Sequence, residues 1–182
     1  MKATSHTYQL SSRTVLGNAT DDRLLSQARL KTPEGRVLLD LIAQATGVPE
    51  VFPDQPEART ALQLVGTQTP SPALDALGRC SRERSCEAGG TAGGGLAQAL
   101  HGINGPTLNH RLQAGHLAQW LDLPEPDATL VRRLYLATLS RPPRPEESAE
   151  WCARLASAGR RREAAEDLLW ALLNSREFLF NH

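Results

Sequence analysis

The chain has 182 residues, with 20 Lys and Arg against 20 Asp and Glu, and aromatic residues make up 4% of it. This length is typical of one domain and suffices to bury a substantial core. The balanced charge gives no net field to attract nucleic acid or an anionic membrane, and the scarcity of aromatic rings leaves few platforms for stacking bases or sugars. No apolar run reaches the length of a membrane span or a signal-peptide core, so the sequence predicts no membrane span.

The chain opens with a segment that predicts an arm and a short helix. Residues 1–20 are polar and lack a sustained apolar period, which indicates an extended arm. Thr20 or Asp21 can cap a short helix that continues to about Leu30, because either side chain can accept a hydrogen bond from an unpaired backbone N–H.

A stronger helix is predicted to begin at Thr32 and Pro33. Thr32 suits the N-cap position and Pro33 the first turn, where the missing N–H of proline costs nothing. Gly47 tolerates the left-handed conformation that ends many helices, and Pro49 supports the same end. The apolar residues predicted to face the core from this helix are Val37, Leu38, Leu41, Ile42 and Ala45.

Residues 48–72 form a proline-rich stretch, which excludes a regular helix and predicts an extended connection. Within it, residues 61–65 alternate weakly between apolar and polar side chains and could form an isolated extended segment. Ser71 and Pro72 then open a short helical turn that ends at Gly78.

The next stretch, residues 79–95, is rich in arginine and glycine and predicts a loop. Helix is expected again over residues 96–100. A further helix begins at Pro106 and continues to about residue 123, although Gly115 weakens its middle.

Three more helices are predicted to form an antiparallel bundle joined by short links. Asp127 caps the first, Pro145 begins the second, which ends at Gly159, and residues 162–182 form the third. The third has apolar residues on nearly all sides, including Trp170, so it is expected to lie at the centre of an all-helical domain. Core residues expected in the first two are Leu130, Val131, Leu134, Tyr135, Thr138, Trp151, Cys152 and Leu155.

One charged cluster is a candidate ligand-binding site. Arginine side chains can hold carboxylate, sulfate or phosphate with two parallel hydrogen bonds, whereas a solvated loop that pairs its charges internally is the structural alternative. An asparagine near the Gly105–Pro106 turn could join the site if it faced a cleft, or could simply stabilise the turn. The candidate residues are Arg79, Arg82, Glu83, Glu87 and Asn109.

The cysteines and histidines do not form a metal-binding pattern. Cys80, Cys86 and Cys152 allow one disulfide and one thiol or three thiols, and no paired Cys-x-x-Cys motif is present. His110 and His116 are six residues apart, which is poor spacing for two ligands on one helical face. The glycine run 89–95 lacks the lysine and hydroxyl of a phosphate-binding loop. The sequence therefore predicts no metal and no cofactor.

Five segments in order resemble the planctomycete family of domains of unknown function numbered 1553 (DUF1553). They are LLDLIAQATGVPE (38–50), GRCSRERSCE (78–87), LAQALHGINGPTLN (96–109), LYLATLSRPPRPEE (134–147) and LLWALLNSREFLFNH (168–182). The last is the most specific. The chain departs from the family's Cys-Glu-Cys-Glu-Arg pattern, since Ala88 and glycines follow Glu87, and Cys80 stands where proline is common.

The resemblance implies the C-terminal part of that domain, in long exported bacterial proteins that often carry a cytochrome-c-like domain. The leading hypothesis is a helical interaction module forming the end portion of such a protein, with an apolar groove that binds other domains or a second copy. One alternative is a polysaccharide-related enzyme domain with its site at the Arg79–Glu87 loop. Another is a redox partner of a linked cytochrome-c-like domain, although the haem-attachment motif Cys-x-x-Cys-His is absent from this sequence.

Overall fold

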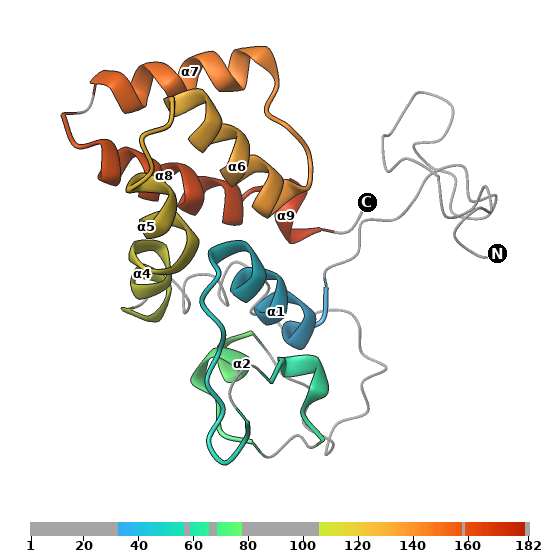
Figure 1. Ribbon diagram of the computed structural model, residues 1–182. Coiled ribbons are helices and arrows are strands. Elements are labelled where there is room, and N and C mark those ends of the chain that lie inside the picture. The colour runs from blue at the N-terminus through green and yellow to red at the C-terminus, as the bar shows by residue number, and fades with distance from the viewer. Residues whose placement is uncertain (1–32, 57–58, 66–68, 78–105, 158, 181–182) are drawn as a thin grey trace, which may run out of the picture.

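The computed structural model describes residues 33–56, 59–65, 69–77, 106–157 and 159–180. Across these ranges the protein is mainly α-helical and has no strand, which confirms the predicted fold class (Figure 1). The predicted arm, the helices near residues 21–30 and 96–100, and the loop 79–95 lie outside the described residues. The elements are α1 (Gly35–Thr46), the 3-10 helix η3 (Ala61–Gln63), α2 (Pro72–Ala76), α4 (Pro106–Gln113), α5 (Gly115–Leu121), α6 (Asp127–Leu139), α7 (Pro145–Ser157), α8 (Arg161–Leu173) and α9 (Arg176–Leu179).

Helices α6, α7 and α8 pack against one another as the predicted antiparallel bundle (Figure 1). Helix α8 also contacts α4, α5 and α9, so its expected central position is confirmed. All five core residues predicted on α6 are buried, and so is Leu155 on α7. The predicted burial of Trp151 and Cys152 is only partly correct, because both are half-buried at the edge of the core.

The C-terminal helix is shorter than predicted and has a solvent-facing side. Helix α8 ends at Leu173, and α9 begins after Ser175, whose hydroxyl accepts a hydrogen bond from the Phe178 N–H and thereby starts a new helix. Trp170 is 43% exposed, so the prediction of its burial was wrong. It shares an outward stripe with Glu163 and Asp167, which lie one or two helical turns earlier.

Helix α1 connects two hydrophobic cores. Its start differs from the prediction, because the N-cap is Glu34 and the first helical residue is Gly35, where a Cβ atom would lie 2.7 Å from the Leu77 carbonyl oxygen. Gly47 ends the helix with φ of 72°, as predicted. The predicted apolar stripe was wrong at Leu41, which is 37% exposed, and it omitted Leu39, which is buried on a second side of the helix.

The larger core joins α1 to the bundle, and the smaller core lies within residues 33–77. In Figure 1, α1 lies between the bundle and the segment that carries η3 and α2. From α1, Leu38 and Ile42 enter the larger core, whereas Leu39 enters the smaller one. The smaller core consists of Leu39, Phe52, Ala61, Leu64 and Leu74.

Residues 61–63 form a 3-10 turn, so the predicted extended segment was wrong. The Asp40 carboxylate accepts hydrogen bonds from the N–H groups of Ala61 and Leu62, at 2.7 and 3.1 Å. The Gln63 side chain accepts another from the Thr60 N–H at 3.2 Å. These acceptors satisfy the N–H groups that the first turn of a helix leaves unpaired, which favours the turn over an extended strand.

The predicted helix from residue 106 to about 123 is broken at Gly115. This residue has φ of 65°, and a Cβ atom there would lie 2.3 Å from the Thr46 carbonyl oxygen. A Cβ atom at Gly47 would lie 2.5 Å from the His116 ring. The end of α1 and the start of α5 therefore approach each other closely at two glycines, and both positions require a left-handed backbone.

Candidate functional site

The structure locates only one of the five predicted site residues. Arg79, Arg82, Glu83 and Glu87 lie outside the described residues, so their proximity to one another stays a prediction. Asn109 is exposed on α4 and lines neither of the two hollows that flank α1.

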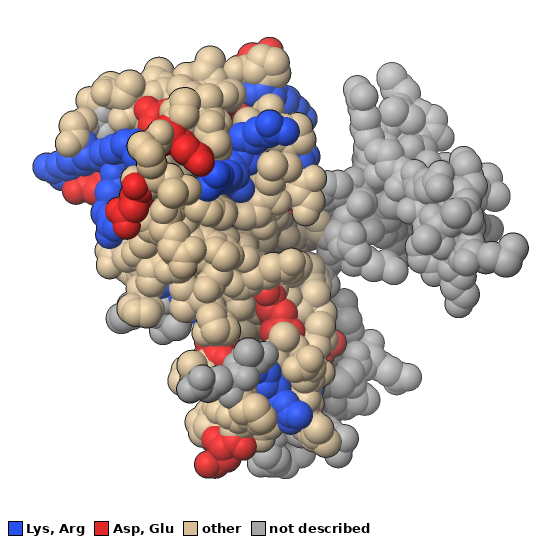
Figure 2. Space-filling view, viewed as in Figure 1, with Lys and Arg blue, Asp and Glu red and all other residues tan. Residues whose placement is uncertain are grey.

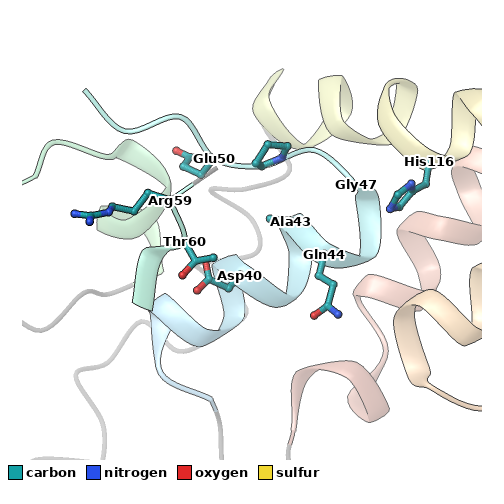
Figure 3. Close-up of a pocket in the computed structure, with 9 residues that line it drawn as sticks. Asp40, Ala43, Gln44, Gly47, Glu50, Arg59, Thr60 and His116 are labelled. Carbon is teal, nitrogen blue, oxygen red and sulfur yellow. The ribbon is translucent and has the colours of Figure 1, made fainter. Parts of the chain in front are cut away.

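Two neighbouring hollows on the described surface form a groove beside α1. The first has a volume of about 500 Å³ and lies between α1, the segment 49–60 and α5 (Figure 3). The second has a volume of about 350 Å³ and lies between α1, α5, α6 and α9. Gln44 and His116 line both hollows, so we call the two together the α1 groove.

The first hollow carries two carboxylates that the surrounding structure holds in place. Asp40 is fixed by the two backbone N–H groups of η3. Glu50 accepts a hydrogen bond from the Ser71 hydroxyl at 3.3 Å and forms an ion pair with Arg111. Figure 3 shows Asp40 and Gln44 along α1, with His116 at the opposite end of the hollow from Arg59. Both carboxylates are therefore positioned before any ligand arrives.

Arg111 is an unusual residue for a helical core. Its side chain is 5% exposed, against 14% for its partner Glu50, and burial lowers the pKa of the guanidinium while the Glu50 charge opposes that shift. Among the described residues, its Nη1 has no hydrogen-bond acceptor. A buried cation with a single carboxylate partner depends strongly on that partner, so the pair joins α4 to the segment after α1.

Aromatic stacking fixes His116 at the boundary of the two hollows. Its ring lies 5.2 Å from that of Trp120, with 8° between the ring planes, and the Arg133 guanidinium lies 6.0 Å from the Trp120 ring. Arg59 lies at the other end of the first hollow and donates a hydrogen bond to Gln55 at 2.8 Å. In Figure 3 its guanidinium points away from Gln44 and His116.

The second hollow brings apolar side chains from separate helices together. Leu41 of α1 and Leu136 of α6 both line it and are 37% and 42% exposed. Trp120, Ala137 and the buried Phe178 also line it, together with the polar residues Gln44, His116, Thr138 and Ser140. The sequence contained one signal for this surface. The apolar residues of α1 span a wider arc than a single core face can bury, and Leu41 lies at the edge of that arc.

The carboxylates and the histidine of the α1 groove are engaged in contacts within the fold. Asp40 and Glu50 are engaged in positioning η3 and Arg111, and His116 is stacked against Trp120. Within the described ranges, no group of three His, Cys, Asp or Glu side chains could hold a metal ion. Cys152, the single described cysteine, forms no disulfide.

The outer surface of the bundle offers no patch of one charge on the face that Figure 2 shows. Basic and acidic side chains are interspersed there. On the described part of the bundle, ion pairs such as Arg133–Glu125, at 2.7 Å, and Arg161–Asp127, at 2.8 Å, bring the two signs together. None of the helices in the described part is both long enough and apolar enough to cross a membrane.

Comparison with known proteins assigns no relative to this chain. No protein-family model matches it, no curated protein is similar to it, and no solved structure matches its fold. The resemblance to DUF1553 therefore stays a prediction, and the groove has to be interpreted from its own residues.

Proposed function

We propose that this chain is a helical protein-interaction module whose docking surface is the α1 groove. The observation that carries the proposal is the pairing of Leu41 and Leu136, which line one hollow from two different helices and remain more than a third exposed. A single exposed leucine is ordinary, whereas apolar side chains gathered in a concave surface are typical of binding sites.

The size of the groove favours a short polypeptide segment over a whole second subunit. Its hollows have volumes of about 500 and 350 Å³. Volumes of this order enclose a few side chains. A stable interface between two folded proteins usually buries about 800 Å² on each partner, a much broader surface than two exposed leucines provide. The segment could come from another domain of a parent protein of the DUF1553 type or from a second copy of the chain.

The two alternatives gain no support from the groove. The enzyme hypothesis depends on the Arg79–Glu87 loop, which lies outside the described residues, and on Asn109, which is away from both hollows. The redox hypothesis depends on the cytochrome-c-like domain that often accompanies the DUF1553 domain. The carboxylates and the histidine of the groove are held in structural contacts, so a docking role fits them better than catalysis.

Peptide selection with matched variants tests the proposal. A phage-displayed random dodecapeptide library is selected on the immobilised full chain, and enriched clones are tested for binding to Leu136→Glu and Val65→Glu. We expect Leu136→Glu to lose binding, because it replaces one of the two exposed leucines of the second hollow with a charge. Val65 is 92% exposed and lines neither hollow, so Val65→Glu is the control and should keep binding.

Each outcome of that selection decides the proposal. Failure to enrich any peptide, or equal binding to Leu136→Glu, would overturn the groove as the docking surface, provided that circular dichroism shows the variant to be folded. Sedimentation of the wild-type chain over a range of concentrations then shows whether the bound segment comes from a second copy of the chain. A dimer that Leu136→Glu abolishes would identify a second copy as the partner.

A further inference from the structure

We infer that the segment bound by the α1 groove is uncharged where it meets the groove. It presents one apolar side chain to the first hollow and, to the second, one neutral side chain with a hydrogen-bonding tip, such as tyrosine or glutamine. This inference rests on the proposed docking function and names the chemistry of the partner. Gln44 lines both hollows, so one short segment can occupy the two together.

The charged groups that line the first hollow already have partners within the fold. The Asp40 carboxylate binds the N–H groups of η3, and Glu50 pairs with the buried Arg111. The guanidinium of Arg59 donates to Gln55. A charged side chain of the partner would lose hydration in this hollow without gaining an unpaired counter-charge, and that exchange is unfavourable.

The surface that remains accessible in the first hollow is mainly apolar. Ala43, Gly47 and Pro49 line it and carry no polar side-chain atom. Its volume of about 500 Å³ is large enough for a leucine or phenylalanine side chain. An apolar side chain there removes apolar surface from water and leaves every existing polar contact intact.

The second hollow differs in the chemistry of its lining. None of the described residues that line it is Asp, Glu, Lys or Arg, and its accessible surface is mainly polar. Within the described part of the chain, neither the Gln44 amide nor the Ser140 hydroxyl has a hydrogen-bond partner. Leu41 and Leu136 line the same hollow. Exposed leucines beside unused polar groups fit a neutral side chain with an apolar body and a polar tip.

The surrounding structure holds Ser140 in position. This residue ends α6 with φ of 55°, and its N–H donates to the Leu136 carbonyl oxygen at 3.2 Å. The next residue, Arg141, pairs with Glu147 and Glu177. Because the backbone on both sides is fixed, a partner can bind the hydroxyl without first ordering this segment.

Peptides enriched by phage selection on the full chain are the probes for this inference. An alanine scan of the tightest peptide, measured by calorimetric titration, identifies the residues that it needs. We expect one apolar and one neutral polar residue each to cost about tenfold in affinity when replaced. The affinity should change by less than about twofold between about 50 and 500 mM salt, because no charge pair forms across the interface.

Three variants of the chain locate the two side chains of the partner. Ala43→Leu fills the first hollow and should weaken binding about tenfold, with circular dichroism as the check of folding. Gln44→Met keeps the length of the side chain but removes its amide, so it should weaken binding about fivefold. Gln119→Met is the matched control, because Gln119 is exposed on α5 and lines neither hollow, and it should change nothing.

The outcomes separate this inference from the proposed function. Peptides that lose binding in Leu136→Glu but need a charged residue, or bind much more weakly at high salt, would overturn the uncharged partner and keep the docking groove. Unchanged binding by folded Ala43→Leu, or equal effects of Gln44→Met and Gln119→Met, would overturn it in the same way. A selection that enriches no peptide overturns the docking function itself, and this inference with it.

Discussion

The C-terminal bundle and the region of residues 33–77 are stabilised in different ways. Within the described residues, the larger core contains 18 buried residues, mainly from the long helices of the bundle and α1, whereas the smaller core contains five. The smaller region compensates with polar contacts between segments far apart in sequence. Asp40 binds the N–H groups of η3, Arg36 donates to the Leu64 carbonyl oxygen at 3.2 Å, and Glu50 pairs with Arg111.

The different packing of the two regions explains why the groove lies between them. A bundle with apolar helical faces closes on itself and leaves few concave surfaces, whereas a small core held by polar contacts can lie beside it with space in between. Helix α1 belongs to both regions, and the groove follows its remaining exposed face. Mutations in one region, compared with matched mutations in the other, test whether the two regions are stabilised independently.

The largest expected effect is on the bundle. Leu168 is 0% exposed in α8, so Leu168→Ala should lower the free energy of unfolding by about 4 kcal/mol through lost burial and an unfilled cavity. Urea titration followed by tryptophan fluorescence measures it, because Trp151 and Trp170 lie in the bundle helices α7 and α8, and Trp120 lies in α5, which packs against α6 and α8.

The matched change in the smaller core is Leu74→Ala, since Leu74 is 1% exposed. We expect it to shift the tryptophan transition much less than Leu168→Ala, while amide exchange in residues 33–77 becomes faster. Equal shifts of the tryptophan transition in both variants would show that the two regions unfold as one unit.

The second prediction compares an ion pair that joins the regions with one on the surface of the bundle. Glu50→Ala leaves the buried Arg111 without its carboxylate, so it should cost about 3 kcal/mol. Glu125→Ala removes a pair whose side chains are 34% and 32% exposed, so it should cost less than about 1 kcal/mol. Thermal denaturation of both variants checks the difference, and similar losses would contradict the structural role of the buried pair.

The third prediction concerns the close approach of α1 and α5. Gly115→Ala combines a left-handed backbone with a Cβ atom 2.3 Å from the Thr46 carbonyl oxygen, so we expect a loss of about 2 kcal/mol. Gly159→Ala is the control, because that residue has φ of 54° with open space around it. Urea titration should show a loss of only about 1 kcal/mol there. If both alanines cost the same, the contact with Thr46 contributes nothing.

The comparison of the two regions also explains how far sequence could predict this fold. Helices α6 to α8 follow from local patterns, because Leu130, Leu134 and their neighbours repeat at helical spacing and proline or glycine separates the helices. The 3-10 turn of the small region does not follow from such patterns. Residues 61–63 form a turn in which Asp40, a distant residue of α1, accepts the N–H groups of Ala61 and Leu62, and no local signal encodes that partner.

The candidate site was less predictable than the fold for the same reason. The sequence directed attention to arginines clustered along the chain at residues 79–84, whereas the groove joins Asp40, Glu50 and His116 from three separate segments. Leu41 was expected in the core because its spacing fits the helix, and spacing alone does not tell how wide a face the neighbouring helices cover.

The smallest expected effect is a pH dependence within the bundle. Arg141, in the link between α6 and α7, contacts Glu147 of α7 at 2.9 Å and Glu177 of α9 at 2.6 Å. Hydrogen bonds from Arg141 lower the pKa of Glu147 to about 2, and a further bond from the Arg144 N–H acts in the same direction, while burial opposes both. A carboxylate with a lowered pKa in the folded state stabilises the protein above its unfolded pKa of about 4.5, and this contribution is lost as the pH falls toward 2.

Glu147→Gln tests this contribution directly. Solvent and salt screen the partly exposed network, so the wild-type chain should be more stable than the variant by about 1 kcal/mol at pH 7. That advantage should decrease as the pH falls below about 4.5 and should be smaller in about 1 M salt, because only the charged carboxylate attracts Arg141. Thermal melting of both chains from neutral to acidic pH measures the difference. Parallel profiles would mean that the Arg141–Glu147 pair contributes nothing to stability, and that packing and the remaining Arg141–Glu177 pair hold the link between α6 and α7.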